Sequence, residues 1–303
     1  MELRPIPNTS LSVSTLCLGT MTFGTPVPEA DAVSLTHWAL DHGINFIDTA
    51  NMYEGYARRI GSAGGVGEEI LGKALRGRRA QAVIATKVGM KIGPTEADEG
   101  LSRAHILREI DRSLKRLQCE AVDLYYMHRP YPSVPLAESI RAMHDLIDAG
   151  KTRYWAVSNF STVELMELLA VCDANHWRRP VAIQPAYSLL KRDIEATLLP
   201  LCVKEKIAVV PYQVLQGGVL TGKYQAGEPV PAHSRAEEKP EWTPKLDEAL
   251  FTQLATIKRE AAARGRTLYQ HALRGPLEQS GVVSLILGVK RQEQLADALA
   301  AVA

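Results

Sequence analysis

The sequence alternates between short apolar runs and longer segments with the spacing of amphipathic helices, and no other feature constrains its fold more. Short runs rich in β-branched residues predict strands, and apolar residues recurring every three or four positions predict helices. We predict eight strands, at residues 16–18, 45–48, 82–86, 122–127, 154–157, 181–184, 208–211 and 284–287. The helices that follow them are predicted at residues 28–42, 68–75, 101–117, 136–149, 161 onward, 194–204, 246–264 and 292 onward.

Two folds accommodate this alternation, an open doubly wound sheet and a closed (β/α)8 barrel. A doubly wound dinucleotide-binding domain carries GxGxxG directly after its first strand, whereas residues 19–24 read GTMTFG. The glycine-rich run 61–67 follows the second strand and lacks the GK-Ser/Thr signature of a phosphate-binding loop, so we interpret it as a flexible loop before a helix. Eight units without a break in composition predict one domain over residues 1–303, a (β/α)8 TIM barrel.

The composition argues against several classes of partner. Lysine and arginine (35) nearly balance aspartate and glutamate (34), so no general field attracts nucleic acid or an acidic membrane. The short basic run 76–79 is interpreted as a solvated helix end. The 4 cysteines lie far apart without a CxxC pair, which is typical of reduced thiols in the cytosol. With no signal-peptide pattern and no run of roughly 18 apolar residues, we expect a cytoplasmic protein.

Ionisable residues follow three successive predicted strands. Asp48, Lys87 and His128 each stand at a strand end, and Tyr53 lies in the loop after Asp48. Taken singly, each has an ordinary explanation as a turn cap, a solvated lysine or a structural histidine. Closure of a barrel, however, brings these strand ends together above one pocket, where barrel enzymes place their catalytic groups. The four residues therefore predict an active site.

This combination suits reduction of a carbonyl group. A tyrosine with a pKa of about 10 is a poor acid at neutral pH. A lysine ammonium about 4 Å away favours the phenolate by roughly 4 kcal/mol at an effective dielectric near 20, equivalent to about three pKa units. Asp48 would hold Lys87 in place, and His128 could donate a hydrogen bond to the carbonyl oxygen. A positioned general acid contributes about 10² to 10⁴ in rate, and we predict Tyr53 as that acid.

At these residues the sequence resembles the aldo-keto reductases. The matching segments run from near residue 16 to the C-terminus, and they are GINFIDTA at 43–50 with Tyr53, Thr86-Lys87, DLY at 123–125, HRP at 128–130, VSNF at 157–160, Gln184, Tyr212, LTGKY at 220–224 and Leu287-Gly288. The resemblance implies a catalytic tetrad of Asp48, Tyr53, Lys87 and His128. It also implies reduction of an aldehyde or ketone to an alcohol by hydride transfer from NADPH.

The resemblance further implies how the nicotinamide is held. Ser158, Asn159 and Gln184 would hydrogen-bond the carboxamide, and Tyr212 would stack on the ring. The alternative for Ser158 and Asn159 is a helix cap before Ser161, where Glu164 completes a capping-box pattern. The other predicted cofactor contacts are Gly19, Thr20, Gln213, Leu215, Gly217, Gly288, Lys290, Arg291 and Gln294.

The far end of the cofactor is expected at the loops after the seventh and eighth strands, where barrels commonly bind phosphate. Gly217 and Gly218 would let the backbone approach a pyrophosphate closely. Lys290 and Arg291 are placed to meet a 2′-phosphate, which favours NADPH over NADH. Gln294 matches the family's contact at the adenosine end.

Several positions depart from the family pattern. Ala298 stands where an asparagine commonly contacts adenine, and Gln213-Val214 replaces a usual Ser-Pro. Residues 274–276 (Arg-Gly-Pro) fall where an unbroken apolar helix is normal, and proline there should end or kink it. The loop 54–67 is longer than typical and borders Tyr53, so we expect it to shape the choice of substrate.

Two other functions remain open at this point. The first is a cofactor-sensing regulatory subunit like the potassium-channel β-subunits, which share the barrel and tetrad. The second is a metal-dependent barrel hydrolase, which needs clustered ligands. Only His128 stands at a strand end, and no HxH or HExxH occurs, so we expect no metal. The expected partner is a small carbonyl substrate, bound by a monomer or homo-oligomer, and not a nucleic acid or membrane.

Overall fold

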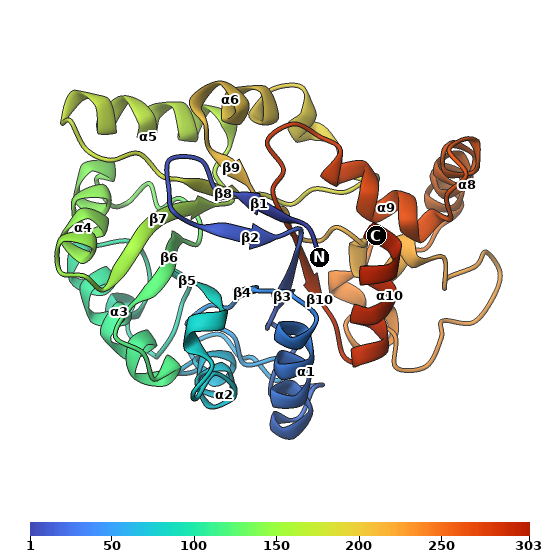
Figure 1. Ribbon diagram of the computed structural model, residues 1–303, viewed down its shortest axis with the longest axis horizontal. Coiled ribbons are helices and arrows are strands. Elements are labelled where there is room, and N and C mark those ends of the chain that lie inside the picture. Colours follow the sequence, from blue (N-terminus) through green and yellow to red (C-terminus); the bar gives the residue numbers. More distant parts are fainter.

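The computed structural model describes residues 1–303, and eight parallel strands form one curled sheet (Figure 1). Their order in the sheet is β10-β3-β4-β5-β6-β7-β8-β9, so each strand lies beside its neighbours in sequence. The strands are β3 (Leu16–Gly19), β4 (Phe46–Asp48), β5 (Val83–Val88), β6 (Val122–Met127), β7 (Thr152–Ser158), β8 (Ala182–Gln184), β9 (Ala208–Val209) and β10 (Leu285–Gly288). All eight were predicted to within a few residues.

The sheet closes where its last strand, β9, meets the start of β10. Val209 forms a parallel bridge with Val282, and the Val283 amide donates to the Val209 carbonyl at 3.0 Å. Further along, the Ile286 amide donates to the Pro211 carbonyl at 2.9 Å. This short seam confirms the predicted (β/α)8 barrel and turns all the strand ends toward one mouth.

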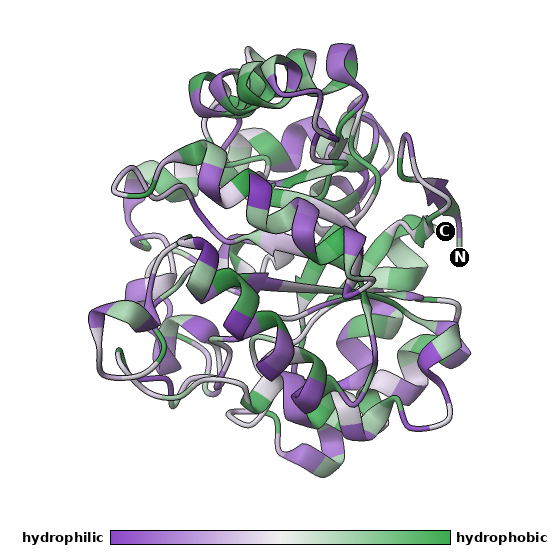
Figure 2. Cartoon of the chain, turned by 90° about the vertical axis from the view of Figure 1, so that its left-hand side faces the viewer, coloured by the Kyte–Doolittle hydropathy of each residue, from purple (hydrophilic) through white to green (hydrophobic).

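Helices surround the sheet, and most of them bury one face against it. The helices are α1 (Glu29–Asp41), α2 (Val66–Ala74), α3 (Arg103–Leu117), α4 (Leu136–Asp148), α5 (Thr162–Ala174), α6 (Leu198–Glu205), α7 (Arg235–Glu238), α8 (Glu248–Ala263), α9 (Leu268–Leu277) and α10 (Gln292–Val302). By contrast, α8 packs on α9, and the short α7 has no buried residue. Figure 2 shows hydrophilic and hydrophobic residues interspersed along these helices, as expected for elements with one wet face. A cluster of 50 buried apolar residues fills the layer between strands and helices.

The helix before β10 differs from the prediction. The predicted helix at 246–264 exists as α8, but it packs on a further helix, α9, and α9 in turn contacts α10. Thr267 starts α9 with a capping box, and Pro276 lies in its last turn. The helix ends at Leu277, one residue after that proline, in line with the expectation that proline would end it.

The predicted helix at 194–204 is shorter in the structure. A 3₁₀ turn, η3 (Asp193–Glu195), precedes α6, which begins at Leu198. Proline is tolerated in the first turn of a helix, where the missing N–H has no partner to lose. Pro200 lies in that first turn of α6, whereas it would interrupt a helix that started at residue 194.

The sequence did not predict an N-terminal hairpin that closes the other end of the barrel. The antiparallel strands β1 (Leu3–Pro5) and β2 (Ser12–Ser14) lie across the end of the barrel that faces the viewer in Figure 1. Ile6, Leu11 and Val13 join the apolar cluster inside the barrel, together with Phe46 and Tyr126. The interior is therefore packed from this side, and ligands can approach the strand ends only at the opposite mouth.

None of the helices combines the length and the apolar character that a membrane crossing requires.

Candidate active site

The predicted catalytic residues from β4 and β5 meet at the mouth. Lys87, at the end of β5, is fully buried, and its Nζ lies 2.5 Å from Asp48 Oδ1 at the end of β4. The same Nζ donates to the Thr49 carbonyl at 2.8 Å and to Tyr53 Oη at 3.2 Å. An ammonium has three N–H donors, so Lys87 is saturated with acceptors. Tyr53 is one of them.

The buried carboxylate is held from both sides. Asp48 Oδ1 pairs with Lys87, and Oδ2 accepts a hydrogen bond of 2.9 Å from Gln184 Nε2 at the end of β8. A buried ion pair is tolerated when further hydrogen bonds satisfy its polar atoms. Although burial lowers the pKa of Lys87, Asp48 and Tyr53 raise it above its ordinary value. Lys87 therefore stays an ammonium at neutral pH.

The electrostatics of Tyr53 differ from the prediction made from sequence. Burial raises the pKa of Tyr53 above 10, and this outweighs the lowering by Lys87, while Asp48 raises it further. The expectation that Lys87 lowers the pKa of Tyr53 toward neutral pH is therefore wrong for this arrangement. The hydroxyl remains protonated at neutral pH, which is the form that a proton donor needs.

His128 follows β6 and lies edge-on to Tyr53. The ring centroids are 6.2 Å apart and the ring planes meet at 80°. Burial, followed by the charges of Lys87, Arg58 and Arg129, lowers the pKa of His128 well below 6.5. The imidazole is therefore neutral and carries one N–H donor. Its Nδ1 is enclosed without a hydrogen-bond partner.

The residues expected around the nicotinamide adjoin this cluster. Ser158 Oγ donates to the Gln184 carbonyl at 2.9 Å, and Asn159 Nδ2 donates to the His128 carbonyl at 2.9 Å. Tyr212 Oη donates to Asn159 Oδ1 at 2.7 Å. Ser161, rather than Ser158 or Asn159, caps α5 through the Glu164 amide. The helix-cap alternative is thus wrong, and both side chains remain at the mouth.

Gly19 and Thr20 lie at the same edge of the barrel as Asp48. Gly19 ends β3 and pairs with Asp48 on one side and Gly288 on the other. Thr20 donates to the Asp48 carbonyl through its amide at 2.9 Å and its hydroxyl at 3.1 Å. A Cβ on Gly19 would lie 2.8 Å from Ile286 Cγ2, so a larger residue does not fit there.

The loop after β9 has the features of a phosphate cradle. Gln213, Gln216, Gly217 and Gly218 all have positive φ, and the 3₁₀ helix η4 (Gln216–Thr221) starts within this turn. Backbone N–H groups in such turns can surround an anion. Lys223 adds a cation, since a Cβ built on Gly218 would lie 2.7 Å from Lys223 Nζ. These donors fit the pyrophosphate of a dinucleotide.

The other predicted phosphate ligands are partly engaged within the protein. Lys290 Nζ donates to the His233 carbonyl at 2.9 Å and forms an ion pair with Glu238. The Lys290 amide donates to Gln294 Oε1 at 2.7 Å. The side chain of Arg291 is largely exposed. These contacts fix the start of α10 beside the mouth.

A further cation beside Lys290 was missed in the sequence. Arg235 of α7 packs on the rings of Tyr56 and Trp242, with its Cζ 4.9 and 5.7 Å from the centroids. Lys290 Nζ approaches the same Tyr56 ring at 5.5 Å. The long irregular stretch before α8 gave no periodic signal that could place Arg235 near Lys290. The sequence showed that Arg235 is charged but not that it lies near Lys290.

The structure shows the surroundings of two positions that depart from the family pattern, Ala298 and the Gln213-Val214 pair. Ala298 is fully buried in the apolar layer under α10, so it offers no polar group to a ligand. Leu215 is partly buried against the core, while the neighbouring Val214 is fully buried. No group of three or more histidine, cysteine, aspartate or glutamate residues is arranged to hold a metal ion.

The parallel barrel, with Asp48, Lys87 and Tyr53 joined at its strand ends, has the form of a TIM-barrel oxidoreductase. The sequence model of the Aldo/keto reductase family matches residues 15–303. The chain belongs to this family, whose members generally reduce carbonyl compounds with nicotinamide cofactors, typically NADPH.

Similar proteins include both enzymes and channel subunits. A probable voltage-gated potassium channel subunit beta of Arabidopsis thaliana is 35% identical over 100% of this chain and 91% of its own. An aldo-keto reductase of Bacillus subtilis is 33% identical over 97% of this chain and 87% of its own. The solved structure of a glycerol dehydrogenase from Gluconobacter oxydans superposes with a TM-score of 0.82 at 29% identity, covering 99% of this chain and 90% of that one.

Proposed function

We propose that this protein reduces a small aldehyde or ketone to an alcohol with NADPH, and that Tyr53 donates the proton. The observation that carries the proposal is the contact of 3.2 Å between Tyr53 Oη and Lys87 Nζ. Lys87 is itself held in place by its buried ion pair with Asp48. Such a phenol is protonated, rigidly placed and next to a cation that stabilises its conjugate base. Membership of the family supports the same chemistry.

Each catalytic side chain has a distinct task in this proposal. Tyr53 transfers its proton to the carbonyl oxygen, and Lys87 stabilises the phenolate that remains. Asp48 keeps Lys87 charged and oriented. His128, neutral because of its surroundings, donates its N–H to the carbonyl oxygen and orients it toward Tyr53. Bound NADPH supplies the hydride.

The residues around the mouth fit the cofactor. Ser158, Asn159 and Gln184 present hydroxyl and amide groups that match a carboxamide, and the Tyr212 ring lies beside them through its bond to Asn159. The positive-φ turn at residues 213–218, with Lys223, would hold the pyrophosphate. Lys290 and Arg235 would meet a 2′-phosphate, which is the reason to prefer NADPH over NADH. Gln294 and Arg291 complete this end.

A regulatory role is the second candidate, because two relatives named as probable voltage-gated potassium channel β-subunits match 100% and 98% of the chain at 35% and 33% identity. It predicts NADPH that stays bound through purification and turns over slowly. A reductase instead exchanges its cofactor at each turnover.

The test is NADPH oxidation followed at 340 nm across a panel of aldehydes and ketones, with NADH as the control. We expect multiple turnovers on several compounds with NADPH and markedly lower kcat/KM with NADH. Absence of turnover on every compound, with NADPH retained in a one-to-one complex, would favour the regulatory role.

A further inference from the structure

Arg58, in the long loop 54–67, is a half-buried cation without an acidic partner. No carboxylate lies within ion-pair distance of its guanidinium. Its Nη1 donates to the Met52 carbonyl at 3.0 Å and its Nη2 to the Lys91 carbonyl at 2.7 Å. A guanidinium has five N–H donors. Most of its donors therefore have no partner within the protein, and its charge has no ion pair.

The position of Arg58 is set by the two loops that carry catalytic residues. Met52 immediately precedes Tyr53, and Lys91 lies in the loop after β5, the strand that ends with Lys87. By bonding to both carbonyls, the guanidinium bridges the loops that follow β4 and β5. It lies beside the proposed reaction centre without belonging to the tetrad.

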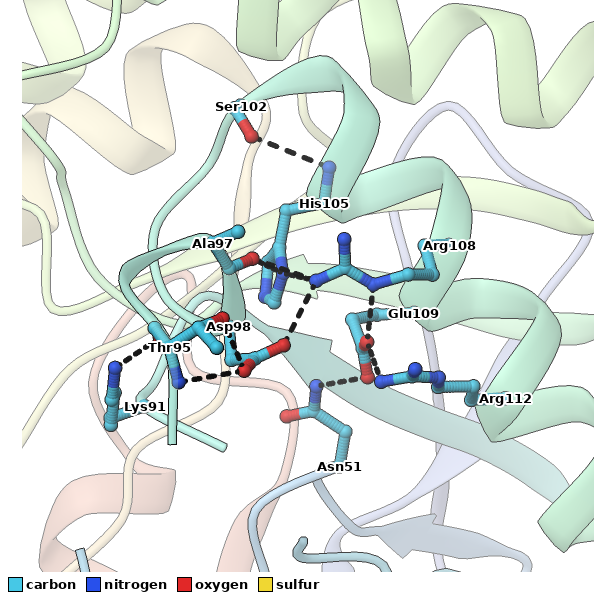
Figure 3. A network of polar contacts seen from close by, with 10 residues as sticks. All are labelled: Asn51, Lys91, Thr95, Ala97, Asp98, Ser102, His105, Arg108, Glu109 and Arg112. Atoms are coloured by element: carbon cyan, nitrogen blue, oxygen red, sulfur yellow. Dashed lines mark hydrogen bonds and ion pairs between the residues drawn. The ribbon is translucent and has the colours of Figure 1, made fainter. Parts of the chain in front are cut away.

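A polar network fixes both of these loops (Figure 3). Lys91 Nζ donates to the Thr95 carbonyl, and Thr95 forms a capping box with Asp98. On the other loop, Asn51 Nδ2 donates to Glu109 Oε2 of α3 at 3.4 Å. Arg108, also on α3, pairs with both Asp98 and Glu109, as the dashed lines in Figure 3 trace. The acceptors that orient Arg58 are therefore preorganised.

Glu54, the acid of the same loop, attracts Arg58 but forms no ion pair with it. Glu54 uses its carboxylate within its own loop, bonding Ser62 Oγ with one oxygen and the Gly64 amide with the other at 3.1 Å. Burial lowers the pKa of Arg58 below its ordinary value, and the attraction of Glu54 only partly offsets this. A partly desolvated charge is costly unless it is paired. An anionic ligand would supply the missing pair.

The electrostatic field at His128 is also positive and would attract an anion. The charged groups that act on its imidazole are Lys87, Arg58 and Arg129, all cations. Arg129 is itself bonded to Glu99 and Tyr131, and its side chain is more exposed than the mouth residues. Lys87 is paired with Asp48, so Arg58 is the one of these three cations that has no ion-pair partner.

We propose that Arg58 is a specificity-determining residue that binds an anionic group on the substrate, so that the preferred substrates are small aldehydes or ketones bearing a carboxylate or phosphate. This inference rests on the proposed reductase function and names the substrate class of that site. The planar fork of the guanidinium suits two oxygens of one anionic group.

The test compares matched carbonyl compounds that differ in charge: succinic semialdehyde with its methyl ester, and glyceraldehyde phosphate with glyceraldehyde. For the wild-type protein with NADPH, we expect a higher kcat/KM for the anion of each pair. In Arg58→Gln, which keeps amide donors but loses the charge, the anion-to-neutral ratio of kcat/KM should fall about 10- to 100-fold. Arg58→Lys should restore part of that ratio. The more responsive pair tells carboxylate from phosphate.

Arg59→Met is the matched control, because Arg59 is the exposed neighbour on the same loop and its side chain makes no polar contact. Its ratios should stay within about twofold of the wild-type values. Equal ratios in wild type and Arg58→Gln would overturn the inference while leaving the reductase function intact. Absence of turnover on all four compounds and on the wider panel would instead overturn the proposed function, and this inference with it.

Discussion

Two regions at the mouth of the barrel both carry buried or half-buried cations, but they balance the charge in different ways. On the floor, Lys87 is fully buried and paired with Asp48 at 2.5 Å. On the rim, Arg58 and Arg235 are partly buried and have no carboxylate within ion-pair distance. The cation of the floor is paired within the protein, whereas we propose that the two cations of the rim pair with bound ligands. We therefore expect substitutions on the floor to cost stability and substitutions on the rim to cost ligand affinity.

The largest expected effect is on the floor. Lys87→Met removes one partner of a buried ion pair and leaves Asp48 without its counter-charge, which costs about 3–5 kcal/mol of unfolding free energy. Urea denaturation monitored by circular dichroism measures this cost. The double variant Asp48→Asn/Lys87→Met should recover part of it, because the uncompensated charge is gone.

The exposed Lys115 on α3 provides the control. Lys115→Met should change the unfolding free energy by no more than about 0.5 kcal/mol. If Lys87→Met cost as little as this control, the floor would not depend on its internal ion pair.

On the rim, Arg235→Met should weaken NADPH binding about 10- to 100-fold, because it removes the charge-assisted contact that we propose to the 2′-phosphate. NADH lacks that phosphate, so its dissociation constant should change far less. Cofactor fluorescence titration measures both, and unfolding free energy should stay close to that of the wild type. An equal loss for NADPH and NADH would place Arg235 away from the 2′-phosphate.

A smaller effect is expected at His128, because burial and then the charges of Lys87 on the floor and Arg58 on the rim lower its pKa. Its pKa in the folded protein lies well below 6.5, so the unfolded chain binds the proton first as the pH falls. Folding stability should therefore drop below pH 6.5, by up to about 1.4 kcal/mol per pH unit, until the pH reaches the folded pKa. His128→Gln removes this contribution. Urea denaturation at pH 7 and pH 5.5 should show a smaller pH-dependent loss for His128→Gln than for wild type, and equal losses would contradict the assignment.

The sequence was informative where a local pattern determines the structure. Periodic segments such as α3, with Ile106 and Ile110 buried on one face, matched their predicted bounds closely. The Ser161–Glu164 capping box was predicted from spacing and is present. The four catalytic candidates were found because the ends of parallel strands must converge once a barrel closes. Three of them are in direct contact or linked through Lys87.

The rest depends on contacts that no local pattern shows. Gly275 and Pro276 are poor helix formers, and α9 forms because its apolar face is buried against neighbouring elements. The closing seam rests on one bridge at Val209 and a few backbone hydrogen bonds rather than on a long strand. The rise in the pKa of Tyr53 depends on how completely the hydroxyl is enclosed, which charge counting along the chain does not give. Arg58 has no ion-pair partner, and the carboxylate of Glu54 instead bonds Ser62 and Gly64.

The central claim is that Tyr53 donates the proton, and Tyr53→Phe tests it most directly. The substitution removes one hydroxyl and keeps the ring. The measurement is NADPH oxidation with the best carbonyl substrate at saturating concentration, beside a fluorescence titration of NADPH. We predict that kcat falls by a factor of about 10² to 10⁴. The dissociation constant for NADPH should stay within about threefold of the wild-type value. Turnover that stayed near the wild-type rate, with normal cofactor binding, would contradict the account.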